Sequence, residues 1–308
     1  MNHDDLPLPI DLYAAARALA YAAALVLIGA CTFAALVPRW RRSGDDDESL
    51  AARTLAGAWR VAGLAAPTLL LAHLLRAWGQ ARSFLDPDPI TWESVKPILF
   101  STTWGRGWMA QVAAALLTLP AARIARRRPA TGLGILGTAT LAVAATEPLT
   151  GHALEHPWGA TLGVGLHTLH LLGGGIWLGT LFTLFQAGLR AARDRDATDV
   201  AEMVGAFSPV ALAGAALAVA AGSLLGIAYV GTFNALVQSN YGRALVLKVV
   251  LLMITMGLGA WNWTNVKPRL GEPGVTRELR RSAGVELAIG LGLIAVTAVL
   301  VALPAPTL

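Results

Sequence analysis

The sequence has few charged residues and almost no cysteine. Of its 308 residues, 14% are Asp, Glu, Lys or Arg, whereas soluble domains carry about 25%. A surface that faces water needs more charge than this, so the composition excludes an ordinary soluble domain. The single cysteine, Cys31, excludes an internal disulfide and a zinc site built from several cysteines.

Two kinds of sequence signal are also missing. The first basic residue is Arg17, so the chain lacks the positively charged start of a secretory signal peptide, and we expect no cleavable one. No ATP-binding motif occurs, so any transport would be passive or coupled to another gradient.

The net charge of +5 resides mainly in loops between apolar runs, and we therefore expect no nucleic-acid partner.

Long apolar runs make up most of the chain. Hydrophobic residues account for 55% of it, and each run is long enough to cross a bilayer core of about 30 Å. A lipid-exposed backbone must satisfy its own hydrogen bonds, so each run is expected to be a helix. We predict an all-α, polytopic transmembrane bundle that forms a single domain over residues 1–308. Its eight predicted spans are residues 11–37, 57–78, 105–122, 131–149, 158–188, 205–231, 242–264 and 283–303.

The loops between these spans differ in charge. Most of the 24 lysines and arginines fall in alternate loops. Since cytoplasmic loops carry the excess of basic residues, we predict that these loops face the cytoplasm and that both termini face the periplasm of a bacterial inner membrane. The longest connection on the opposite side, residues 79–104, contains prolines and interfacial aromatic residues. We interpret it as a lid or an interfacial segment.

All histidines lie on the predicted outer side or in the outer half of the bilayer. They are His3, His73, His152, His156, His167 and His170. If Trp78 and Trp158 mark the interface, His73 lies about 8 Å deep, and the two in span five lie about 13 and 18 Å deep. The histidines therefore form a series that begins at the surface and ends near the bilayer middle.

The fifth span places two histidines beside glycines on one face. The residues Gly163, His167, His170, Gly174 and Trp177 follow one another by four, three, four and three positions. This spacing is typical of one side of a helix. Small residues there allow a neighbouring helix to approach closely, so the pattern predicts a packed interface that contains two imidazoles.

Methionines and the amino terminus extend the list of candidate ligands. Met253 and Met256 lie on span seven at about the depth of His170 or just below it. Imidazole suits copper, zinc and haem iron, thioether sulfur favours Cu(I), and calcium and magnesium prefer oxygen. In the start Met-Asn-His, the α-amine, two backbone amides and His3 would offer Cu(II) four nitrogens in a square plane. The whole set predicts a route for copper.

Each candidate also has a structural interpretation. A neutral buried histidine can hydrogen-bond between helices, and a methionine in a membrane helix normally packs. Histidines in loops and tails can be incidental. Lys248 is predicted either to reach outward to the interface or to pair with a carboxylate such as Glu147.

Three ordered sequence elements resemble the CopD family of copper-resistance membrane proteins. They are HTLHLLGGGIWLGTL (167–181), FSPVALAGAALAVAAGSLLG (207–226) and YGRALVLKVVLLMITMGLGAWN (241–262). The resemblance is strongest over residues 150–268, and the first four spans are similar only in number and topology. Trp263 follows Asn262 where the family leads us to expect a basic residue.

The resemblance implies a protein that moves copper from the periplasm toward the cytoplasm and is not an enzyme. It also implies a CopC-like periplasmic copper chaperone as a separate partner. Two other functions stay open. A haem b group held between His73 and His167 or His170 would make the chain an electron-transfer protein. An assembly subunit without transport would use its buried histidines only for helix packing.

Overall fold

The computed structural model describes residues 12–41, 49–85, 88–192, 196–272 and 274–307. Regular structure in these ranges is helical, with no strand among them. Eight spans are long and apolar enough to cross a membrane, which confirms the predicted all-α polytopic fold. They are Leu12–Arg39, Leu50–Leu85, Thr103–Arg127, Pro129–Thr150, Ala160–Leu189, Ala197–Val230, Asn240–Arg269 and Val275–Ala302. His3 lies outside the described residues.

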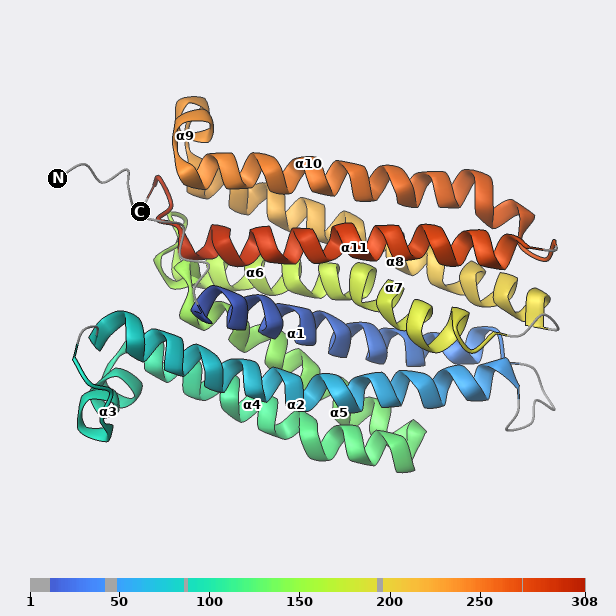
Figure 1. Ribbon diagram of the computed structural model, residues 1–308, viewed down its shortest axis with the longest axis horizontal. Coiled ribbons are helices and arrows are strands. Elements are labelled where there is room, and N and C mark those ends of the chain that lie inside the picture. Colours follow the sequence, from blue (N-terminus) through green and yellow to red (C-terminus); the bar gives the residue numbers. More distant parts are fainter. Residues whose placement is uncertain (1–11, 42–48, 86–87, 193–195, 273, 308) are drawn as a thin grey trace.

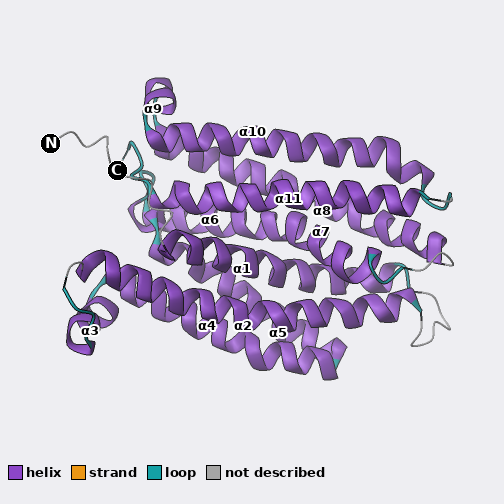
Figure 2. Cartoon of the chain, viewed as in Figure 1, coloured by secondary structure: helices purple, strands orange, loops and turns teal. Residues whose placement is uncertain are grey.

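Helices make up most of the described chain and are joined by short loops (Figure 2). Several spans combine a long α-helix with short segments of other helix types. The long helices are α1 (Leu12–Leu36), α2 (Leu50–Leu85), α4 (Thr103–Arg127), α5 (Pro129–Thr146), α6 (Ala160–Gly174), α8 (Ala197–Val230), α10 (Asn240–Trp261) and α11 (Val275–Ala302). The short α-helices are α3 (Trp92–Ser101), α7 (Thr180–Thr183) and α9 (Phe233–Gln238). The 3₁₀ segments are η2 (Val37–Arg39), η3 (Glu147–Thr150), η4 (His152–Glu155) and η9 (Lys267–Arg269). The π-helical segments are η5 (Gly175–Gly179), η6 (Leu184–Leu189) and η8 (Asn262–Val266).

The spans lie side by side and give the bundle two ends (Figure 1). We call the end at which α1 begins and α11 ends the termini end. At the opposite end, the chain turns after η2, α4, η6 and η9. The basic loops of the sequence are found there, so we call it the arginine-rich end.

Helix α1 is central to the bundle. It packs against α2 and α5 on one side and against η5, α7 and α11 on another. Nearly half of its buried positions are alanine, which lets neighbouring backbones come close. One apolar core joins α1, α2, α4 and α5, and a second joins α1 and α2 with α7, α8 and α11. Helix α1 therefore connects the two groups of spans.

A close backbone contact joins α1 to the fifth span. A Cβ atom on Gly179 would overlap the carbonyl group of Leu25, and one on Gly29 would overlap the backbone at Gly179. Both positions therefore need glycine for the two helices to cross as they do. Gly179 is not one of the glycines that the sequence pattern placed at the packed interface of this span.

The fifth span departs from a regular α-helix after Gly174, where the π segment η5 begins. A π turn changes the spacing at which residues face a neighbour, so regular α-helical spacing applies only up to Gly174. Gly174 does not meet a backbone in this way. A Cβ atom on it would lie 3.2 Å from a side-chain methyl group of Leu25. Gly173, which the spacing rule does not place on that face, packs against the α8 backbone at Ala218, where a Cβ would lie 2.5 Å from the nitrogen.

The connection over residues 79–104 is more helical than its prolines suggested. Helix α2 continues to Leu85, and α3 accommodates Pro97 without a break. No residue of α3 is buried, and Trp92 and Phe100 are among its exposed aromatic side chains. None of its residues lines the cavities described below. A role at the membrane interface stays a prediction for this segment.

We expect Gly179→Ala to destabilise the protein by about 1–3 kcal/mol or more, because the added methyl group would overlap the α1 backbone. The measurement is thermal unfolding in detergent micelles. Gly137→Ala on α5 is the matched control, since a Cβ there meets nothing within 4 Å. Equal melting temperatures for the two variants would contradict the assigned contact.

Candidate functional site

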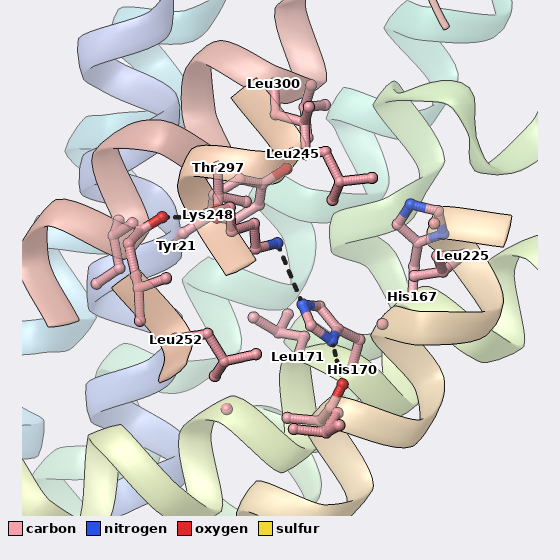
Figure 3. Close-up of a pocket in the computed structure, with 18 of the residues that line it drawn as sticks. Tyr21, His167, His170, Leu171, Leu225, Leu245, Lys248, Leu252, Thr297 and Leu300 are labelled. Atoms are coloured by element: carbon pink, nitrogen blue, oxygen red, sulfur yellow. Dashed lines mark hydrogen bonds between the residues drawn. The ribbon is translucent and has the colours of Figure 1, made fainter. Parts of the chain in front are cut away.

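A cavity of about 200 Å³ lies between α1, α6, α8, α10 and α11 (Figure 3). Most of its lining is aliphatic. Its polar side chains are Tyr21, Glu147, His167, His170, Tyr229, Tyr241, Lys248 and Thr297. A smaller cavity of about 40 Å³ shares Glu147 and His167 with it and is also lined by Arg17 and His152. We refer to these as the main cavity and the small cavity.

His170 on α6 is held in one orientation by the backbone of α8. Its Nδ1 lies 2.7 Å from the carbonyl oxygen of Ala218, so Nδ1 carries the proton and donates it. The other nitrogen, Nε2, therefore keeps its lone pair and lies 3.5 Å from Lys248 Nζ (Figure 3). Gly222 makes room for the ring, since a Cβ there would be 2.8 Å from His170 Cε1.

His167 is oriented by the same chemistry one turn earlier on α6. Its Nδ1 lies 2.9 Å from the carbonyl oxygen of Gly163, to which it donates. The lone pair is again on Nε2, and the ring lines both cavities. The sequence prediction that His167 and His170 face one site is consistent with their shared place in the main cavity.

Lys248 on α10 contacts His170 and not Glu147, which was one of the two sequence-based expectations for it. Its side chain is half-buried and lines the main cavity. The amine donates toward His170 Nε2, so it occupies the side of the ring that would face a metal ion.

Tyr229 on α8 links three of the histidines. Its ring centroid lies 6.2 Å from that of His152, 5.1 Å from His156 and 5.8 Å from His167. Its hydroxyl donates to the backbone carbonyl of His152 at 3.0 Å. Sequence reasoning missed this residue, although a tyrosine at the end of an apolar span, close in depth to the histidines, is a usable signal.

The two loop histidines differ in what their ring nitrogens can do. His152 donates from Nε2 to the Leu303 carbonyl oxygen at 3.1 Å, which leaves a lone pair on Nδ1. His156 Nδ1 accepts the backbone N–H of Trp158 at 3.1 Å, so its lone pair is already in use. Burial lowers the pKa of His156 and favours its neutral form. Of the two, His152 is therefore better suited to bind a metal ion.

His73 belongs to a different polar group, on the far side of Glu147 from the main cavity. It is fully buried, and its Nε2 lies 3.2 Å from Glu147 Oε1. Arg76 contacts the other carboxylate oxygen at 3.6 Å and donates to Gln111 and Thr150. His73 lines neither cavity, so it is separate from the site that His167 and His170 share.

The two methionines face away from the histidines. Met253 is 62% exposed and Met256 is 37% exposed on the outer surface of α10. Leu252 of the same helix lines the main cavity, whereas neither methionine does. The structure therefore does not place a thioether beside His170.

Within the described ranges, no three His, Cys, Asp or Glu side chains converge as a metal-binding group. The main cavity instead offers the Nε2 atoms of two oriented imidazoles, with Lys248 beside one of them. Such an arrangement can bind a soft or borderline metal ion through few ligands.

Known families match most of this chain in two parts. The copper resistance protein D family matches residues 201–300, and the copper resistance protein D-like N-terminal domain matches residues 7–158. The second match covers the first four spans, where the sequence resemblance rested only on their number and topology. His167 and His170 lie between the two matched ranges.

A curated relative matches along nearly the whole chain. The copper transport protein CutJ from Bacillus subtilis is 29% identical over 307 residues, which are 95% of this chain and 53% of that protein. The chain thus spans about half the length of this relative. No solved structure matches it. The two family matches and this relative agree, and the chain belongs to the copper resistance protein D family of membrane proteins.

Proposed function

We propose that this protein binds copper at His167 and His170 and carries it through the membrane. One observation carries the proposal. Each ring donates its Nδ1 proton to a backbone carbonyl, so the lone pair is on Nε2, and both rings line the same cavity. Imidazole nitrogen is a good copper ligand, and an acceptor at the other nitrogen orients such ligands. The name of the family supports copper as the transported ion.

In this proposal, copper enters from the termini end. The basic loops lie at the opposite end, which the distribution of lysine and arginine assigns to the cytoplasm. His152 lines the small cavity, which shares His167 with the main cavity, so ligands follow one another inward. The movement is from the periplasm to the cytoplasm across the inner membrane, and a CopC-like chaperone is the partner that delivers copper.

The haem b alternative has less support. His73, one of its two axial ligands, is enclosed by Glu147 and Arg76. The main cavity of about 200 Å³ is also smaller than pockets for small organic ligands, which measure about 300–1,000 Å³. An assembly role without transport makes a different prediction, namely that histidine variants change stability alone.

We expect the double variant His167→Leu, His170→Leu to fold but to lose copper binding, because it removes both Nε2 ligands while keeping apolar side chains in the cavity. The measurement is copper stoichiometry of purified protein by elemental analysis. The control variant Met253→Leu, Met256→Leu alters only the outer surface of α10 and should bind as the wild type does. Full copper stoichiometry in the folded histidine variant would refute the proposed site.

We expect Lys248→Met to bind copper at least about tenfold more tightly, since a nearby positive charge opposes a cation by up to about 4 kcal/mol at 4 Å in partly polar surroundings. Tighter binding should slow the release of copper from the site, so the rate of copper uptake into proteoliposomes should fall. Lys248→Arg keeps the charge and is the control. Unchanged affinity in the methionine variant would show that the amine does not act on the metal site.

We expect Gly222→Val to weaken copper binding although both histidines remain. A Cβ at this position would meet the His170 ring at 2.8 Å and turn its Nδ1 away from the Ala218 carbonyl. Gly205→Val on the same helix, where a Cβ meets nothing within 4 Å, is the control. Competition with a chromogenic copper chelator measures the affinity, and equal values for the two variants would disprove this role of Gly222.

A further inference from the structure

A second polar cluster lies beyond the main cavity, nearer the arginine-rich end. Glu286 on α11 is buried, with 4% of its surface exposed. Asn262 Nδ2 donates to Glu286 Oε2 at 3.4 Å, and the side chain of Trp177 lies close to the same carboxyl group. Oε1 lies beside Gly259 of α10, where a Cβ would be 3.6 Å away. We call Trp177, Asn262 and Glu286 the Glu286 cluster.

No positively charged side chain of the described residues pairs with Glu286. On the elements packed against α11, the titratable groups have other contacts. They are Arg17 with Tyr13, Cys31 with Thr140, Lys248 with His170, Arg190 with Gln186, Tyr241 with Tyr229, Arg243 with the Val237 carbonyl, Lys267 with Trp263 and Arg269 with Glu278. Tyr21 lines the cavities, and Arg277, Arg280 and Arg281 of α11 itself are exposed. The carboxyl group therefore has only neutral partners.

A buried carboxyl group with neutral partners is suited to hold a proton. An ionised carboxylate without a cation is costly inside a membrane, and such groups mark ion and proton pathways. The Asn262 amide can serve both protonation states. When Glu286 is ionised, Asn262 Nδ2 donates to the carboxylate. When Glu286 is protonated, the amide can rotate by half a turn, and its buried Oδ1, which now has no hydrogen-bond partner, accepts the proton of the carboxylic acid.

The Glu286 cluster is connected to the copper site through Trp177. This side chain lines the main cavity and also contacts Glu286. Trp177 belongs to the π segment η5 and Asn262 to the π segment η8, and π turns are frequent at functional sites. Ser282, one helical turn from Glu286 toward the arginine-rich end, adds a buried hydroxyl without a hydrogen-bond partner.

We propose that Glu286 is a proton-binding site linked to copper in the main cavity. A copper ion there favours the ionised carboxylate by charge attraction. Copper binding breaks the O–H bond of Glu286 and releases the proton to solvent, and the proton returns when copper leaves. Because linkage is reciprocal, copper binds more tightly as the pH rises through the range in which Glu286 loses its proton. The inference rests on the proposed copper site.

The test measures protons released when copper is added to the full protein in weakly buffered detergent solution. Wild type, Glu286→Gln and Glu155→Gln are compared, and the last variant removes an exposed carboxylate as a matched control. We expect all three to bind the same amount of copper, and Glu286→Gln to release less than half as many protons as the other two. The rise of copper affinity with pH should also flatten in that variant alone.

The outcomes separate the two proposals. Normal copper binding with undiminished proton release in Glu286→Gln would overturn the proton site and leave the copper site standing. A wild-type protein that binds no copper would overturn the copper site and the linkage together.

A second measurement uses only the wild type, in case Glu286→Gln does not fold. Infrared difference spectra with and without copper should show loss of the C=O stretch of a protonated carboxylic acid. The band should shift when glutamate is labelled with ¹³C. No change in this band on copper binding would overturn the proposal.

Discussion

The close crossing of α1 and the fifth span is the contact on which the rest of the bundle depends. Gly29 and Gly179 allow the two backbones to meet without an intervening side chain. Helix α1 also packs against α2 and α5, so this crossing sets how near the two groups of spans lie. Both α1 and the fifth span line the main cavity, and His170 lies only two to three turns from Gly179 along the same span. The size of the cavity is therefore coupled to this contact.

The buried histidines are held in two different ways. Arg76, His73 and Glu147 form a charged group in which opposite charges balance. His167 and His170 are instead held by backbone carbonyl groups, which take one nitrogen of each ring. Glu147 is already paired with Arg76, whereas Nε2 of His167 belongs to a ring that lines the main cavity and Nε2 of His170 faces only the amine of Lys248. This difference is the physical reason for placing copper in the main cavity and not at His73.

Much of the fold and part of the site could be predicted from sequence. Hydropathy and length alone identify eight spans, because a bilayer admits little besides apolar helices. The spacing of His167 and His170 places them on one side of α6, and both line the main cavity. A spacing of three residues is sufficient for this because it depends only on the geometry of one helix. The same spacing places Trp177 on this side, and Trp177 also lines the main cavity although the π segment begins at Gly175.

The sequence by itself determined the membrane class, the helices and the pair of histidines on α6, since each depends on local composition or helical periodicity. The tertiary structure decided which way each helix turns about its own axis, and this depends on its neighbours. It turned Met253 and Met256 outward, enclosed His73 with Glu147 from a distant span, and buried Glu286 beside Trp177 and Asn262. Depth along a helix can be counted from sequence, but rotation and partners are set only when the helices pack.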